Sequence, residues 1–195
     1  MLIFDEVISG FRVGFEGAAG YYAIQPDIVT YGKIIGGGMP VGAFGASNEI
    51  MSMISPDGPV YQAGTLSANP VAMAAGIASI VLLLQDGFYE VLEQKTESFC
   101  SKIEEHIESN AYPMRIERIA SIFWLNFSDN RVFSADQIDA SKMELFKKLH
   151  AGLLDNGVYL GPSGYEVGFV SAAHSDELLE EAATKICKEI DKLFN

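Results

Sequence analysis

Glycine and charge are distributed unevenly along the chain, and this constrains the fold more than any other feature. Residues 1–85 carry 13 of the 19 glycines but only two of the 13 basic residues. Three short apolar runs, at 2–4, 28–29 and 41–44, are separated there by Gly-rich turns. This pattern is typical of parallel strands buried on both faces. We therefore expect an α/β sheet in the first part of the chain.

The second part, residues 86–195, is patterned mainly as amphipathic helix. Apolar side chains recur at helical spacing in three stretches, which begin at Phe88, Met143 and Leu179. Two shorter stretches, 119–127 and 158–160, are predicted to be strands. The fold class is thus α/β, with a sheet domain over 1–85 and a smaller α+β domain over 86–195.

Helix signals are clear at two places. Asn69 and Pro70 are a good N-cap and first residue for a helix over the 14-residue apolar run 71–84. That run is shorter than the ~20 residues that cross a bilayer, so we expect a buried helix. Asn156 and Gly157 provide a helix stop.

Composition excludes several classes of function. The net charge of −13 repels phosphate backbones, so nucleic acid and acidic membranes are not expected partners. The two cysteines, Cys100 and Cys187, form no CxxC or Cys/His cluster, which argues against a zinc site and a disulfide scaffold.

The chain opens directly on an apolar strand pattern, with no basic region or cleavage site ahead of it. A domain seldom begins inside its own core. We therefore expect this sequence to be the C-terminal part of a longer chain.

Lys33 is the only lysine in the first 94 residues, and it lies between the apolar strand 28–31 and Gly36–Gly38. Partial desolvation there favours a neutral amine, which makes it a candidate Schiff-base nucleophile. The alternative is a lysine that extends from a strand end into solvent. The glycines lack P-loop and GxGxxG spacing, so they predict a flexible turn with positive φ.

Asp5 and Glu6 also follow an apolar strand, and α/β sheets bind ligands at the carboxyl ends of strands. A carboxylate there can hold a cationic ring nitrogen or a metal, or simply cap a turn. Together with Lys33, an acid suggests pyridoxal phosphate, which needs a lysine for its aldehyde and an acid for its pyridinium nitrogen.

Other polar residues carry weaker signals. Thr65, beside Gly64 and ahead of a helix, could donate to an anion or cap its own turn. The three histidines predict surface or local structural roles; they are His106, His150 and His174.

Several segments resemble the class III pyridoxal-phosphate aminotransferases. They read LIFDEV, GFR, PDI, YGKIIGGG and YQAGTLS. Within that family, GGGMPVGAFG, YQAGTLSANP and the stretch from GVYL to YEVGFVSAAH are similar to the glutamate-1-semialdehyde 2,1-aminomutases. The resemblance spans almost the whole chain, which is less than half of a complete member.

The resemblance implies a fold type I transferase and a role for each matching residue. Lys33 would bind the aldehyde of pyridoxal 5'-phosphate and carry protons, Asp5 would pair with the pyridinium nitrogen, and Val7 would pack on the ring. Thr65, with Gly64, would reach the phosphate of the neighbouring subunit's cofactor in a homodimer.

On the substrate side, the resemblance places Glu166 near the substrate end of the site. It also implies a small-molecule substrate, the pyridoxamine 5'-phosphate form of the cofactor, no metal, and a cytoplasmic protein, or a plastid one in a plant or alga.

The expected activity is conversion of glutamate-1-semialdehyde to 5-aminolevulinate for tetrapyrrole (porphyrin) synthesis, with this chain inactive alone. One alternative is a class III intermolecular aminotransferase, and another is a non-catalytic folded or dimerising fragment. Many class III transaminases that use 2-oxo acids carry an arginine about where Gly168 lies, and residues 165–173 contain none.

Overall fold

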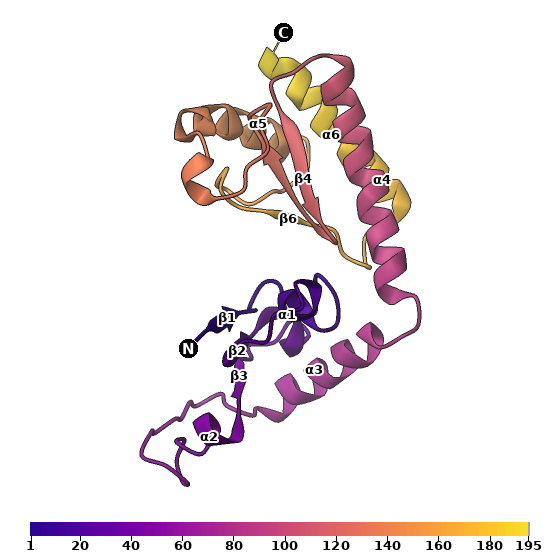
Figure 1. Ribbon diagram of the computed structural model, residues 1–195. Coiled ribbons are helices and arrows are strands. Elements are labelled where there is room, and N and C mark those ends of the chain that lie inside the picture. The colour runs from indigo at the N-terminus through magenta and orange to yellow at the C-terminus, as the bar shows by residue number, and fades with distance from the viewer. Residues whose placement is uncertain (195) are drawn as a thin grey trace. The chain divides into compact units, whose positions relative to one another are not determined.

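The computed structural model describes residues 1–194 and divides into two compact units, Met1–Tyr89 and Glu90–Asn195 (Figure 1). The boundary expected at residue 85 falls in the turn between two helices. The division lies four residues later, since the Tyr89 hydroxyl donates to the carbonyl of Phe11 at 3.0 Å and ties Tyr89 to the first unit.

The first unit contains a three-stranded sheet in the order β1 (Ile3–Asp5), β2 (Ile28–Tyr31), β3 (Ala43–Ala46). β1 and β2 are parallel, as expected, but β3 is antiparallel to β2. The expectation of parallel strands throughout is therefore wrong for β3. The link from β2 to β3 holds only the short 3-10 helix η1 (Lys33–Gly36) and a turn, too little for a parallel crossover.

The glycine turn itself is as predicted. Gly37 and Gly38 have φ of 56° and 91°, the left-handed region that glycine enters without strain. Gly37 also approaches Ala75 so closely that an added Cβ would lie 2.4 Å from the Ala75 carbonyl oxygen. The turn therefore requires glycine for both its conformation and its packing.

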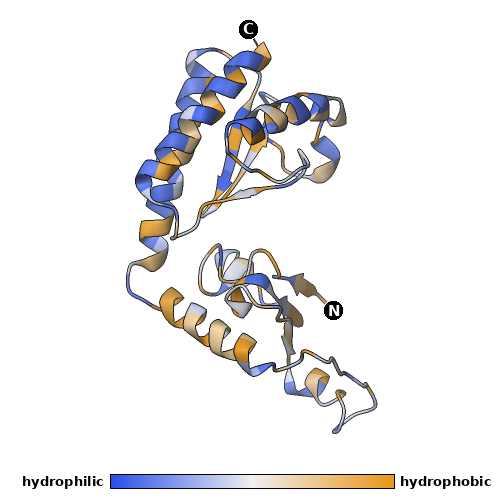
Figure 2. Ribbon diagram, turned by 180° about the vertical axis from the view of Figure 1, so that it is seen from behind, coloured by the Kyte–Doolittle hydropathy of each residue, from blue (hydrophilic) through white to orange (hydrophobic). Residues whose placement is uncertain are grey.

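Three helices complete the first unit: α1 (Gly17–Tyr21), α2 (Asn48–Met51) and α3 (Pro70–Leu83). The predicted start of α3 is confirmed, because the Asn69 side chain accepts from the backbone N–H groups of Val71 and Ala72. Figure 2 shows α3 as apolar along its length.

The expectation that α3 is buried is wrong. Its fully buried residues are Ala72 and Gly76, and Gly76 lies against the carbonyl of Ile35 in η1. The opposite side of the helix is exposed, because no other segment of this unit covers it among residues 1–89.

The second unit packs three long helices with an antiparallel sheet in the order β4-β5-β6. Its elements are α4 (Phe88–Ser109), β4 (Arg115–Ile119), β5 (Ile122–Asn126), η2 (Ala135–Gln137), η3 (Ala140–Lys142), α5 (Met143–Asp155), β6 (Gly168–Phe169) and α6 (Asp176–Phe194). The three predicted helices are confirmed. Their most buried side chains form the core of the unit and include Ile103, Leu149, Leu153, Ile186 and Ile190.

Of the two strands predicted in this unit, the one within 119–127 is confirmed as β5 with narrower bounds, and the one at 158–160 is wrong. β5 is the second strand of a hairpin that turns at Ala120 and Ser121, and the first strand, β4, alternates polar and apolar side chains. Residues 158–160 form no strand, since their backbone has no ladder partner in the described part of the chain. The helix stop is confirmed: α5 ends at Asp155, and Gly157 has a φ of 77°.

No single helix within residues 1–194 is long and apolar enough to cross a membrane, although α3 and α4 taken together as a bent pair pass the same criterion.

Candidate functional site

Asp5 lies at the carboxyl end of β1, directly opposite Thr30 of β2. Its Oδ1 accepts from the Thr30 hydroxyl at 3.3 Å and from the Val7 backbone N–H at 3.1 Å. Oδ2 has no hydrogen-bond donor among the described residues, and the side chain is exposed. One carboxylate oxygen is thus held in place while the other is available to a cationic donor.

Glu6, the next residue, points into the unit and is 1% exposed. Its two oxygens accept from the backbone N–H groups of Ala18 and Ala19 at 2.9 and 2.7 Å, and from the Ser9 hydroxyl. A carboxylate at the first turn of α1 is also favoured by the partial positive charge of a helix start. Glu6 therefore anchors the loop after β1. The two adjacent acids have different roles, because Glu6 is structural and Asp5 has an oxygen available to a ligand.

The glycine at the start of α1 makes this anchor possible. Gly17 has a φ of 64°, and an added Cβ would lie 2.7 Å from Glu6 Oε2. Any side chain there would displace the carboxylate.

The loop anchored by Glu6 and the residues that pack on it are partly shielded from solvent. Burial, and then the charge of Glu6, raise the pKa of Tyr31, while burial lowers the pKa of Arg12. The Arg12 Nε donates to the carbonyl of Ile8 at 3.1 Å. Gly10 lies so close to the Tyr31 ring that a Cβ would approach it to 2.7 Å. The packing fixes the segment that carries Val7.

Lys33 begins η1, two residues after β2 ends. Its φ is 47°, an unusual value for a residue with a long side chain, and the side chain is exposed. Such backbone strain clusters at functional sites. Gly32 on its N-terminal side lies against Val7, where an added Cβ would be 3.2 Å from Cγ1. The structure therefore brings Asp5, Val7 and the Lys33 segment together at the carboxyl ends of β1 and β2.

Gly64 and Thr65 lie in an exposed loop ahead of α3. Gly64 lines a cavity of about 440 Å³ together with Val41, Gly42 and Met73. No hydrogen bond joins either residue to Asp5 or Lys33 within the described residues. The first unit thus does not itself assemble Thr65 with the lysine.

Glu166 belongs to the second unit. It is exposed, its backbone N–H donates to the Ser163 carbonyl at 2.9 Å, and its side chain lies over Gly161.

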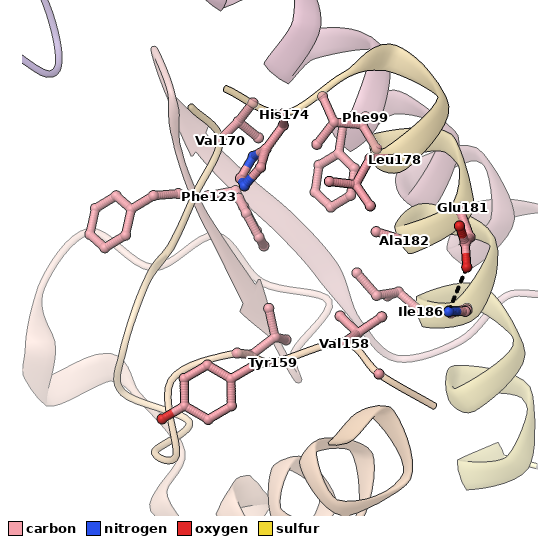
Figure 3. Close-up of a pocket in the computed structure, with 15 residues that line it drawn as sticks. Phe99, Phe123, Val158, Tyr159, Val170, His174, Leu178, Glu181, Ala182 and Ile186 are labelled. Carbon is pink, nitrogen blue, oxygen red and sulfur yellow. Dashed lines mark ion pairs between the residues drawn. The ribbon is translucent and has the colours of Figure 1, made fainter. Parts of the chain in front are cut away.

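The second unit contains an apolar cavity of about 310 Å³, shown in Figure 3, that holds none of the predicted site residues. Phe99, Phe123 and Ile186 are among the side chains that line it, and the Glu181–Lys185 ion pair, with 2.7 Å between Oε1 and Nζ, lies beside it.

His174 also lines this cavity. Its Nδ1 accepts from the Ser171 backbone N–H at 3.2 Å, which agrees with a local structural role.

The edge of the first unit has a definite chemistry. The Lys33 primary amine can attack a carbonyl carbon. The Asp5 carboxylate has an oxygen, Oδ2, that can pair with a cation. No cluster of three or more metal-ligating side chains occurs in residues 1–194. The sequence reasoning missed the contributions of Thr30 and of the buried Glu6 carboxylate. Thr30 lies opposite Asp5 in the β1–β2 register, which the structure gives and the local sequence does not.

Comparison with known proteins agrees with this chemistry. The family model described as aminotransferase class-III matches residues 1–190. A glutamate-1-semialdehyde 2,1-aminomutase from Bdellovibrio bacteriovorus is 50% identical over 184 residues, which cover 94% of this chain and 43% of the relative.

Two solved structures show the same fold. A transaminase with PLP bound is 29% identical, with a TM-score of 0.83, and the match covers 98% of this chain and 44% of that one. A glutamate-1-semialdehyde aminomutase from Pseudomonas aeruginosa is 22% identical, with a TM-score of 0.83 and the same coverage. The chain thus spans less than half the length of these relatives. Its matched residues include the whole Asp5–Lys33 edge, and the chain belongs to the class III aminotransferase family.

Proposed function

We propose that this chain carries the lysine-bearing part of a pyridoxal-phosphate-dependent aminomutase that converts glutamate-1-semialdehyde to 5-aminolevulinate, the precursor of tetrapyrroles. The observation that carries this proposal is the 50% identity to the Bdellovibrio aminomutase over 94% of the chain. The structurally similar transaminase with PLP bound is 29% identical.

The residues at the sheet edge fit the cofactor. Asp5 Oδ2 is available to accept a pyridinium N–H, and Lys33 supplies an exposed amine for an aldehyde. Val7, held between them against Gly32, offers an apolar surface for a ring. When bound, pyridoxal phosphate supplies an electron sink that stabilises negative charge on the substrate carbon.

The chain's own residues would then act in three ways. The Asp5 carboxylate would keep the proton on the ring nitrogen, because its negative charge favours the cationic form. The Lys33 amine would move protons between neighbouring carbon atoms of the substrate. Thr30 would keep Asp5 in position through the hydrogen bond from its hydroxyl. Glu6 would keep the loop that carries Val7 in position through its bonds to the backbone of α1.

The second unit bears on the choice between aminomutase and transaminase. At Gly168 an added Cβ would lie 2.2 Å from Cζ of Phe123, its partner in the sheet. No side chain can occupy that position without moving the Phe123 ring, so an arginine that binds a 2-oxo acid has no room there. This supports an enzyme whose substrate keeps its own nitrogen.

Assembly is part of the proposal. We expect a homodimer in which Thr65 and Gly64 contact the phosphate bound by the partner subunit, which is consistent with their exposed loop. We also expect the 195-residue chain to be inactive alone, because the binding energy for cofactor is shared with parts of the relatives that have no counterpart here.

The test is a chimera in which this chain replaces the matching segment of the Bdellovibrio aminomutase. The chimera is incubated with glutamate-1-semialdehyde and no amino acceptor, and 5-aminolevulinate is measured. Turnover without an acceptor, lost in Lys33→Ala, supports the aminomutase. Turnover that requires a 2-oxo acid and rises with its concentration would replace it with an intermolecular transaminase.

A further inference from the structure

Phe11 lies in the middle of the loop 6–16, which joins β1 to α1 and carries Val7. Its φ is 59°, in the left-handed region that a bulky side chain rarely adopts, and it is the only non-glycine residue of the loop with a positive φ. A residue stays in such a conformation only where the surrounding structure holds it there. The backbone at Phe11 therefore needs support from outside the loop.

Tyr89, in the first turn of α4, gives that support. Its hydroxyl donates to the Phe11 carbonyl at 3.0 Å, between residues 78 positions apart in the sequence. No other donor within residues 1–194 binds that carbonyl. Burial raises the pKa of the Tyr89 phenol above its ordinary 10.0, so the hydroxyl keeps its proton at neutral pH. The Phe11 carbonyl thus depends on Tyr89 for its hydrogen bond.

The ring of Phe11 connects the loop to the end of β2. Its centroid lies 5.4 Å from that of Tyr31, the last residue of the strand. Gly32, the next residue, packs against Val7, and Lys33 follows it. A shift of Phe11 would therefore act on both the loop that carries Val7 and the strand end that leads to Lys33.

The other contacts of the loop hold its two ends. The Glu6 carboxylate binds the backbone N–H groups of Ala18 and Ala19, just after the loop. The Glu6 carbonyl accepts from the Gly10 N–H at 2.8 Å, near its start. The bond from Tyr89 adds a third attachment, at the middle of the loop.

We propose that Tyr89 is a positioning residue for the cofactor. Its hydroxyl holds the Phe11 backbone, and through Phe11 it keeps Val7 and the Lys33 segment in the arrangement that receives the pyridine ring. The role is indirect, because the hydroxyl is bound to a backbone carbonyl. The inference rests on the proposed function for the identity of the cofactor.

The first experiment needs no cofactor and uses the 195-residue chain. Hydrogen–deuterium exchange, read by mass spectrometry, compares the wild type with Tyr89→Phe, which removes the hydroxyl and keeps the ring. We expect amides of the loop 6–16 to exchange about fivefold faster in the variant, the effect of losing one hydrogen bond, and those of α3 to exchange as before. The matched control is Tyr22→Phe, at an exposed tyrosine of the same unit, and should behave like the wild type.

The second experiment measures cofactor binding by the chimera with the Bdellovibrio aminomutase. Pyridoxal phosphate is titrated and its absorbance band gives the dissociation constant. We expect Tyr89→Phe to raise this constant about fivefold and Tyr22→Phe to leave it unchanged. A purely structural role for Tyr89 would lower the stability of the protein but would not change the constant while the protein is folded.

Two results would overturn the proposal alone. One is loop exchange in Tyr89→Phe equal to that of the wild type, and the other is faster exchange with an unchanged dissociation constant, since the hydroxyl would then stabilise the loop only. A wild-type chimera that binds no pyridoxal phosphate would instead overturn the proposed function, and this inference with it.

Circular dichroism verifies that each variant is folded. If Tyr89→Phe is unfolded, Phe11→Leu decides the question, because it keeps the carbonyl and loses the ring contact with Tyr31. We expect Phe11→Leu to raise the dissociation constant at least threefold, and an unchanged constant would overturn the proposal.

Discussion

The Thr30 hydroxyl donates to Asp5 Oδ1 across the parallel β1–β2 pair, at an oxygen–oxygen distance of 3.3 Å. Because the Val7 N–H binds the same oxygen, the carboxylate is held from two sides and its Oδ2 faces outward. The orientation of the acid is therefore built into the strand register.

Replacing Thr30 tests this arrangement. Thr30→Val keeps the shape of the side chain but removes the donor, and one lost hydrogen bond to a charged group corresponds to about 1.5 kcal/mol. We expect kcat/KM of the chimera to fall roughly tenfold. Thr30→Ser restores the donor and should recover most of the loss. Equal activity of the Val and Ser variants would show that the bond has no role in positioning.

Lys33 is expected to be the residue that binds the cofactor aldehyde. Borohydride reduction of the chimera with pyridoxal phosphate should yield an adduct that peptide mass spectrometry maps to Lys33. Lys33→Ala should abolish both adduct and turnover, because Lys33 is the only lysine in the first 94 residues of the chain. Lys147→Ala, an exposed site on α5, is the control. An adduct at any other lysine of this chain would contradict the assignment.

Glu6 is expected to stabilise the first unit without touching substrate. Glu6→Ala leaves the half-buried N–H groups of Ala18 and Ala19 without their acceptor, at a cost of about 2 kcal/mol in the free energy of unfolding. Urea denaturation of the chain measures this loss. The exposed Glu49→Ala on α2 is the control and should change stability by less than about 0.5 kcal/mol. A loss for Glu6→Ala no larger than that of the control would contradict the anchoring role.

Local signals predicted much of this structure. Asn69 and Pro70 set the start of α3, and Gly157 follows the end of α5, because caps depend on a few neighbouring residues. Amphipathic spacing located α4, α5 and α6, since their apolar sides pack within the second unit. Lys33 and Asp5 were recognisable as strand-end groups for the same reason.

What was missed depends on distant residues. The direction of β3 follows from the length of its link to β2, which the apolar run 41–44 does not reveal. The role of Glu6 requires α1 to fold back on it, twelve residues along the chain. The exposure of α3 could not be inferred from its composition, because an apolar run predicts a buried helix and does not show which residues would cover it.

Cys100 provides a pH-dependent prediction for the second unit. Burial in α4 raises the pKa of its thiol from 9.0 to about 12, which the charge of Arg118 offsets only in part. At pH 8 the native thiolate fraction is then about a thousandfold lower than in the unfolded chain. Iodoacetamide should therefore leave Cys100 unmodified at pH 8 in buffer and modify it rapidly in urea.

The same shift affects stability at alkaline pH. Because the folded pKa lies above the unfolded one, the contribution of Cys100 is fully present below about pH 9 and is lost as the pH rises toward 12. Urea denaturation from pH 8 to 11 should show the stability of the wild-type chain falling more steeply than that of Cys100→Ala. The variant loses packing at every pH but no longer releases this proton on unfolding. Parallel pH profiles for the two proteins would show that the thiol is not held neutral by the fold.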